Sequence, residues 1–163
     1  MGRRPFAFLA AATAVVFAAL TAGPAAGAAT GSSAGRERYP ADLSLAGHAN
    51  HRRPLPGEVQ EVRWTVRNHG SRPVTAVDLD ATVPEVWRLQ DDSGCARRDR
   101  GRLHCALGPL SRGESRTVRF ELAVPPRPRL GFEDYRARTR FTVDGTGYDG
   151  PSAHMRVEVV RHR

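Results

Sequence analysis

The sequence predicts an all-β protein, an antiparallel β-sandwich of seven to eight strands preceded by an N-terminal signal helix. Beyond residue 40, apolar and polar side chains alternate in short runs, and Gly, Pro and Asn separate these runs. No run after the N-terminal segment has a helical apolar period. Two sheets packed through their apolar faces are the simplest way to bury such a pattern.

Residues 1–28 are predicted to be a signal peptide. Arg3 and Arg4 supply a positive start, residues 6–20 are apolar and uncharged, and Ala26 and Ala28 fit the small-residue positions before a cleavage site. A membrane anchor is the alternative, but this apolar stretch is shorter than the roughly 20 residues that span a bilayer. The Arg3-Arg4 pair leaves the general secretory and twin-arginine routes both open. We therefore expect a secreted protein, extracellular or associated with the cell wall, with no membrane span after cleavage.

Residues 29–39 are small and polar and predict a flexible leader, and residues 40–163 are predicted to form one domain. The expected strands, in order, lie at 41–47, 58–68, 74–83, 86–90, 103–107, 115–124, 135–143 and 153–160. The connections between them are rich in glycine, proline or charge, and lie at 48–57, 68–73, 91–101, 108–113, 125–128 and 144–150. The expected core contains Trp64, Trp87, Phe120 and Phe141 together with about a dozen aliphatic residues, enough for independent folding.

The two cysteines, Cys95 and Cys105, are predicted to form a disulfide, because an even number of cysteines in an exported chain is typical of such a bridge. The bridge would close a short loop and stabilise the fold by roughly 2.5–3 kcal/mol in the chain-entropy model. A structural zinc site would need two further ligands, which the sequence does not supply.

All 25 basic residues are arginine, and removal of Arg3 and Arg4 leaves 23 arginines against 17 acidic residues, a net charge of +6. This charge favours loose attraction to extracellular polyanions such as wall polymers, anionic lipid or free nucleic acid. The arginines are spread from Arg36 to Arg163 and do not indicate dedicated nucleic-acid binding. An arginine-only composition is also typical of a genome rich in G and C.

Arg136, Arg138 and Arg140 form the one concentrated basic feature. Residues two apart on a strand share a face, which places successive guanidinium groups about 7 Å apart. Arg63 and Arg67 would extend this row if their strand lay in the same sheet. The row is a candidate polyanion-binding face. The alternative is a solvated sheet face paired with acids such as Glu121 or Glu158.

Other candidate chemistry is weak. Asp144 and Asp149 bracket a glycine-rich stretch and could offer oxygens to Ca²⁺, but turn formation explains them equally. His48 and His51 lie on a proline-rich loop and are a weak metal signal. Asp78 and Asp80 are expected to be surface partners of arginines. A hydrolase built from scattered histidines and acids is the remaining alternative, and no nucleophile motif supports it. We assign no catalytic residue, metal or cofactor.

The chain also resembles a known family. The matching features are the ADLSLAG strand at 41–47, an Asn-x-Gly turn at Asn68–Gly70, the cysteine pair, and a Leu-Gly-x-Leu-x-x-Gly-Glu run at Leu107–Glu114. These resemble the DUF11 domains of bacterial surface proteins, here in a single copy. The resemblance covers 41–124 well and the last two strands loosely. It implies an immunoglobulin-like sandwich without shared catalytic residues, with a structural or adhesive role towards an extracellular protein or a cell-wall polymer.

Overall fold

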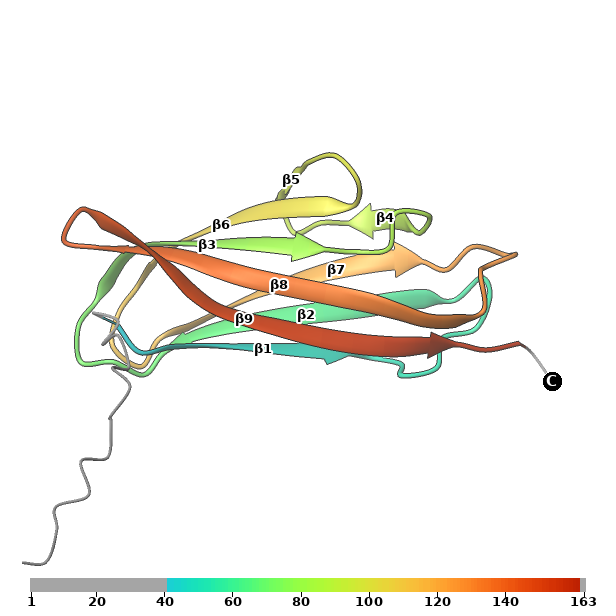
Figure 1. Cartoon of the computed structure of the whole chain (residues 1–163), viewed down its shortest axis with the longest axis horizontal. Coiled ribbons are helices and arrows are strands. Elements are labelled where there is room, and N and C mark those ends of the chain that lie inside the picture. The colour runs from blue at the N-terminus through green and yellow to red at the C-terminus, as the bar shows by residue number, and fades with distance from the viewer. Residues whose placement is uncertain (1–40, 162–163) are drawn as a thin grey trace, which may run out of the picture. The chain divides into compact units, whose positions relative to one another are not determined.

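Two antiparallel sheets packed face to face make up residues 41–161, the part of the chain that this computed structural model describes (Figure 1). Within these residues there are nine strands and no helix. One sheet has the order β1-β2-β7-β4, with β1 (Leu43–Ala49), β2 (Val59–Asn68), β7 (Ser115–Ala123) and β4 (Arg88–Asp91). The other has the order β5-β6-β3-β8-β9, with β5 (Ala96–Arg97), β6 (Arg102–Leu110), β3 (Val74–Thr82), β8 (Gly131–Val143) and β9 (Thr146–Val159). This arrangement confirms the immunoglobulin-like antiparallel sandwich.

The predicted signal peptide at 1–28, with Ala26 and Ala28, and the predicted leader at 29–39 lie outside the described residues. The part of the chain that the structure describes has no helix of the length and apolarity that a membrane crossing requires.

The core lies between the sheets and is built from the alternating residues that the sequence assigns to the inner faces. On β2, Val62, Trp64 and Val66 are fully buried, whereas Arg63 and Arg67, at alternate positions, are exposed. The same alternation buries one side of β3, β7 and β8. The aromatic residues expected in the core are all buried: Trp64, Trp87, Phe120 and Phe141. Period-two alternation therefore fixes which side of each strand faces solvent.

The Asn-x-Gly turn and the Gly-Glu turn meet at one end of the sandwich. The buried Asn68 side chain accepts a hydrogen bond from the Gly70 N–H at 2.9 Å and donates to the Leu110 carbonyl at 3.2 Å. Its backbone carbonyl accepts from the Gly113 N–H, and its N–H donates to the Glu114 carbonyl. These two sequence motifs are thus bonded to each other and tie β2 to the turn between β6 and β7.

Several expected boundaries are wrong. The glycine-rich stretch at 144–150 is not a long turn, because Asp144 and Gly145 alone form a two-residue hairpin turn with φ of 50° and 80°, and β9 begins at Thr146. β6 ends at Leu110, inside the loop that was expected at 108–113, and its pairing to β3 is irregular there. The charged 91–101 stretch contains the short strand β5, so residues 41–161 hold nine strands in place of seven to eight.

The first and last strands lie next to each other along one side of the sandwich. β1 and β9 are edge strands of different sheets and lie side by side, and both run in the same direction (Figure 1). This leaves the outer faces of the two sheets as the two broad surfaces of the domain.

Candidate functional site

A disulfide joins Cys95 to Cys105 and confirms the predicted pairing. It ties the segment before β5 to β6, and the hairpin between the two cysteines carries Arg98, Arg100 and Arg102. The turn of the hairpin is closed by a hydrogen bond from the Arg98 N–H to the Arg102 carbonyl at 2.8 Å. The disulfide holds the base of the hairpin on the five-stranded sheet.

Gly101 fixes the tip of this hairpin against the end of β3. Its carbonyl accepts a hydrogen bond from the Val83 N–H at 2.9 Å. It has a φ of 67°, and a Cβ atom at this position would lie 2.4 Å from the Val83 carbonyl oxygen. Only glycine fits so close to the neighbouring backbone.

The predicted arginine row lies on β8 next to this hairpin. Arg136, Arg138 and Arg140 point outward, and the residues between them are buried. Across the ladder, Arg136 faces Thr82 of β3, and Arg138 faces Asp80. The β8 row and the hairpin therefore stand on either side of the outer face of β3.

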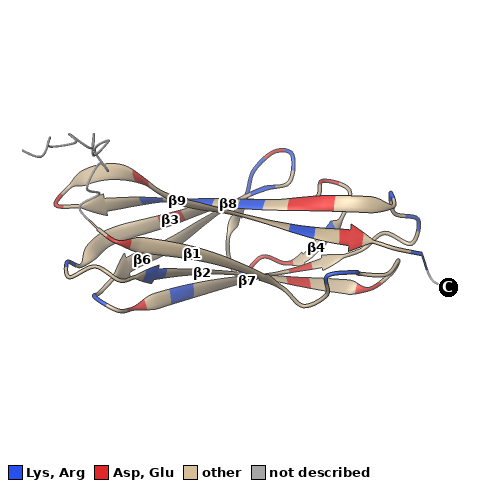
Figure 2. Ribbon diagram, turned by 60° about the horizontal axis from the view of Figure 1, so that its bottom comes forward, with Lys and Arg blue, Asp and Glu red and all other residues tan. Residues whose placement is uncertain are grey.

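Together these segments line an open groove of about 990 Å³. Six arginines and two aspartates contribute to its lining: Arg98, Arg100, Arg102, Arg136, Arg138 and Arg140, with Asp80 and Asp99. We call this the arginine groove. Its basic residues lie on β8 and on the projecting hairpin (Figure 2). The groove carries a clear excess of positive charge.

Asp80 balances part of this charge. Its carboxylate accepts a hydrogen bond from Arg140 at 2.6 Å, pairs with His104 at 3.0 Å, and lies 3.7 Å from Arg138. Partial burial opposes ionisation of Asp80, but the hydrogen bonds and positive charges of Arg140 and His104 outweigh it and lower its pKa below 3.8. Asp80 therefore holds two arginines of the β8 row.

The rest of the groove lacks such a partner. Among residues 41–161, no carboxylate lies within ion-pair distance of Arg98, Arg100, Arg102 or Arg136. The end of the groove beside Thr82 is thus the more electropositive part, and it can attract anionic groups.

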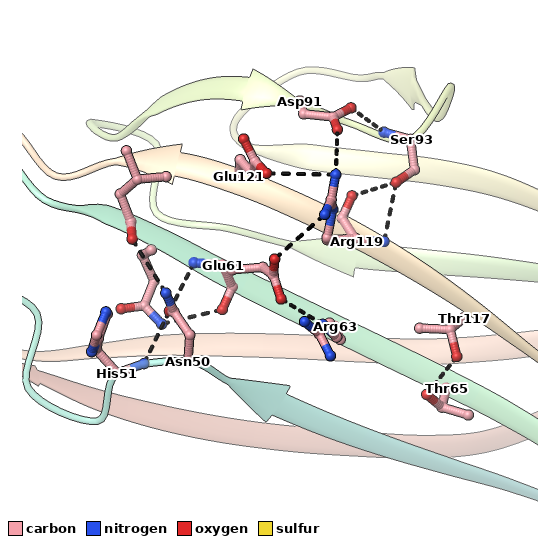
Figure 3. Close-up of polar contacts among 12 residues, drawn as sticks. Asn50, His51, Glu61, Arg63, Thr65, Asp91, Ser93, Thr117, Arg119 and Glu121 are labelled. Carbon is pink, nitrogen blue, oxygen red and sulfur yellow. Dashed lines mark hydrogen bonds and ion pairs between the residues drawn. The ribbon is translucent and has the colours of Figure 1, made fainter.

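Arg63 and Arg67 do not extend the row, and this expectation is wrong. Their strand, β2, belongs to the four-stranded sheet, so they point outward from the opposite side of the sandwich. There Arg63 is bonded to Glu61, whose carboxylate also lies 3.6 Å from Arg119 (Figure 3). Arg119 is paired in turn with Asp91 at 3.5 Å and with Glu121 at 3.6 Å. That face has its own acids.

The acids expected to pair with the β8 row also lie elsewhere. Glu121 pairs with Arg119, and Glu158 pairs with Arg53 at 3.0 Å. The carboxylate that pairs with the β8 row is instead Asp80, in agreement with the expectation that it pairs with arginines. Asp78 lies 3.8 Å from His104.

The weaker candidates do not converge on a site. Asp144 lies at a turn tip and pairs with Arg72 at 3.7 Å, whereas Asp149 faces Arg140 across the β8–β9 ladder. His48 is on β1 and His51 in the loop that follows it. Within residues 41–161, no group of three or more His, Cys, Asp or Glu side chains is placed to hold a metal ion.

The hairpin arginines are the part of the groove that sequence reasoning missed. The stretch 91–101 reads as a charged turn, and its hydrogen bonding to the sheet is not visible in an alternation pattern. The available signal was the spacing of Arg98, Arg100 and Arg102 between two cysteines, because a disulfide keeps such a segment beside the strand that bears the second cysteine.

No protein-family model matches the chain, and no curated protein matches it. The DUF11 assignment therefore stays a prediction. Among solved structures, the chain is similar to a part of native alpha-2-macroglobulin from Escherichia coli, with 13% identity and a TM-score of 0.54 over 74% of this chain and 17% of that one. This likeness supports the fold alone.

A second similar structure is the CARDB domain of a Pyrococcus furiosus protein in complex with di-metal ions. It has 17% identity and a TM-score of 0.49, and the match covers 74% of this chain and 89% of that one. A third is BslA, a bacterial hydrophobin, with 16% identity and a TM-score of 0.48 over 74% of this chain and 95% of that one.

Proposed function

We propose that this protein is a secreted, non-enzymatic immunoglobulin-like module that binds extracellular polyanions, such as an anionic cell-wall polymer, in the arginine groove. The observation that carries the proposal is the six arginines, drawn from β8 and from the disulfide-closed hairpin, that share one groove with only two aspartates. Guanidinium groups form paired, charge-assisted hydrogen bonds with phosphate, sulfate and carboxylate groups.

The secreted location is supported by two independent features. The N-terminal sequence has the charge, apolar stretch and small-residue site of an export signal. The Cys95–Cys105 disulfide is of a kind that persists in oxidising compartments outside the cytosol.

The proposal is tested by retention of the secreted protein on heparin and on a teichoic-acid resin over a salt gradient. We expect retention at low salt that falls steeply as salt rises, because binding to polyanions releases counterions. The triple variant Arg136→Ser, Arg138→Ser, Arg140→Ser should elute much earlier.

The control removes the same charge from the opposite face, with Arg63→Ser, Arg67→Ser and Arg119→Ser, three exposed residues on the outer face of the four-stranded sheet. Equal retention of the two triple variants would show that only net charge matters and would overturn the groove as a site. A structural or adhesive role through another surface, towards a protein partner, would then be the better explanation.

A further inference from the structure

The arginine groove has two parts that differ in how their charge is balanced. Arg138 and Arg140 are held by Asp80. At the other end, Thr82 lies between two arginines on neighbouring strands, because it is paired with Arg102 of β6 and with Arg136 of β8. All three of these side chains are exposed on the outer face of the sheet.

We infer that Arg102, Thr82 and Arg136 form an anchoring subsite for one tetrahedral oxyanion, a phosphate or sulfate group, of the bound polymer. This inference rests on the proposed function and adds to it the position and the chemistry of the strongest contact. We call these three residues the Thr82 subsite.

The geometry of the sheet supports this subsite. Neighbouring strands lie about 4.8 Å apart, so the Cα atoms of Arg102 and Arg136 are roughly 10 Å apart with Thr82 midway between them. Long side chains on either side of a central residue can converge above it. An anion placed over Thr82 would receive guanidinium hydrogen bonds from two sides and a hydroxyl hydrogen bond from below.

The surroundings of the Thr82 subsite add positive charge. Arg98 and Arg100 line the same groove from the hairpin, which Gly101 fixes beside the end of β3. His154, the residue opposite Arg136 on β9, is bonded to Asp134 at 2.9 Å. Asp134 also accepts a hydrogen bond from Arg156 at 2.9 Å, so this carboxylate has its own partners on β9.

Asp80 explains why the other end of the groove is the weaker part. A ligand that engages Arg140 must replace a hydrogen bond of 2.6 Å to Asp80 and must approach that carboxylate. Arg102 and Arg136 have no such bond to break among the described residues. The first anionic group should therefore bind at the Thr82 subsite, and later groups should extend along β8.

The lining also indicates how the polymer is recognised. None of the residues that line the groove is Phe, Tyr or Trp, so the groove offers no aromatic surface on which a base or sugar ring could stack. This lining fits recognition of the charged groups along the backbone of the polymer, without contacts to its bases or sugar rings. We therefore expect bases or sugar rings to add little to the affinity.

The experiment measures affinity at low salt by fluorescence anisotropy, with three labelled probes. These are an abasic phosphodiester oligomer, a sulfated heparin oligosaccharide, and oligoglutamate of the same length as a carboxylate control. Two variants remove equal charge from the two ends of the groove: Arg102→Ser with Arg136→Ser, and Arg138→Ser with Arg140→Ser. The single change Thr82→Val removes the hydroxyl without altering charge.

We expect the first double variant to lose about 100-fold in affinity for the preferred probe and the second about tenfold or less, since charge-assisted hydrogen bonds to an anion are individually strong. Thr82→Val should lose about tenfold, the size of one hydrogen bond from a neutral donor to a charged group. The stronger of the phosphodiester and sulfate probes identifies the source of the oxyanion. Oligothymidine of the same length, added as a fourth probe to test the bases, should bind no more tightly than the abasic oligomer.

The outcomes separate the inference from the proposed function. Equal losses in the two double variants, no effect of Thr82→Val, or oligoglutamate binding as tight as both other probes would each overturn the Thr82 subsite and leave polyanion binding standing. Absence of binding by the unmodified protein to all three probes would overturn both. Unchanged circular dichroism of every variant shows that folding is intact, as expected for exposed side chains.

Discussion

The outer faces of the two sheets carry arginines on the same kind of strand surface, yet their charges are arranged differently. On the four-stranded sheet, Arg63 and Arg119 share Glu61, and Arg119 also has Asp91 and Glu121 (Figure 3). In the arginine groove of the five-stranded sheet, six arginines have two aspartates among them. Arg63 and Arg119 on the first face therefore have carboxylate partners, whereas the groove on the second has an excess of positive charge.

The difference arises from which side chains face each other, directly and diagonally, on neighbouring strands. On the paired face, Glu61 lies opposite Glu121 and Arg63 opposite Arg119, so unlike charges meet diagonally. In the groove, the strand between the arginine-bearing strands supplies Thr82 at one level and Asp80 at the next. One carboxylate on β3 therefore decides how much of the groove is free to bind a ligand.

The largest effect is expected from removing the disulfide, which should affect the groove far more than the paired face. The variant Cys95→Ser with Cys105→Ser should lose roughly 2.5–3 kcal/mol of unfolding free energy, because the unfolded chain gains loop freedom. The loosened hairpin should also weaken retention on heparin. Urea denaturation and salt-gradient elution measure the two effects. Unchanged retention would mean that the hairpin arginines take no part in binding.

Gly101→Ala should have the next largest effect, because it pushes the hairpin away from β3. The left-handed φ and the contact with the Val83 carbonyl together should cost about 1–3 kcal/mol in unfolding free energy and reduce heparin retention. Gly57→Ala is the matched control, since Gly57 has a φ of 82° and nothing within 4 Å of the added Cβ. If both variants lost the same stability, the contact with Val83 would have no role.

A smaller effect is expected when one arginine is removed from each face and the unfolding free energies are compared. Arg119→Ser should lower the unfolding free energy by up to about 1 kcal/mol, because it removes a partner from three partly exposed carboxylates. Arg136→Ser should leave it unchanged or raise it slightly, since this change reduces repulsion within the groove. Urea denaturation of the two variants tests this, and the reverse ranking would contradict the contrast between the faces.

The smallest effect is the pH dependence of Asp80. Its pKa is lowered in the folded protein, so its contribution to stability is complete above its ordinary value of 3.8 and is lost as pH falls through the lower folded pKa. Protonation there also releases Arg138 and Arg140, so affinity for a sulfated resin should rise in the same acidic range.

Asp80→Asn isolates this group from the other carboxylates. The variant should bind about two- to threefold more tightly at neutral pH, which is a modest gain because the pair is partly exposed. It should also show a smaller rise in affinity on acidification than the unmodified protein. Identical pH profiles for the two proteins would exclude Asp80 as the group that balances the groove.

The sequence predicts the inner faces of the strands well because burial imposes the period-two pattern directly. Trp64, Phe120 and Phe141 are all buried as this pattern requires. It also places Arg136, Arg138 and Arg140 correctly on one outer face. These predictions depend only on the local geometry of a strand.

Relations between strands are harder to predict, because alternation does not tell which sheet a strand joins. Arg63 and Arg67 have the same outward pattern as the β8 row but belong to the other sheet. The alternation pattern predicts that Asp80 lies on the surface. Its position between His104 and the β8 arginines, however, follows only from the register of three strands. The Thr82 subsite likewise requires knowing the neighbours of β3.

The side-by-side placement of β1 and β9 has a mechanical consequence. The start of β1 and the end of β9 lie at opposite ends of the sandwich (Figure 1). Tension between them would act along the strand axes and would load the β1–β2 and β8–β9 ladders in shear, so that many perpendicular hydrogen bonds resist together. The resistance of a module pulled in this way while its groove holds a polymer would be set by its rate of unfolding.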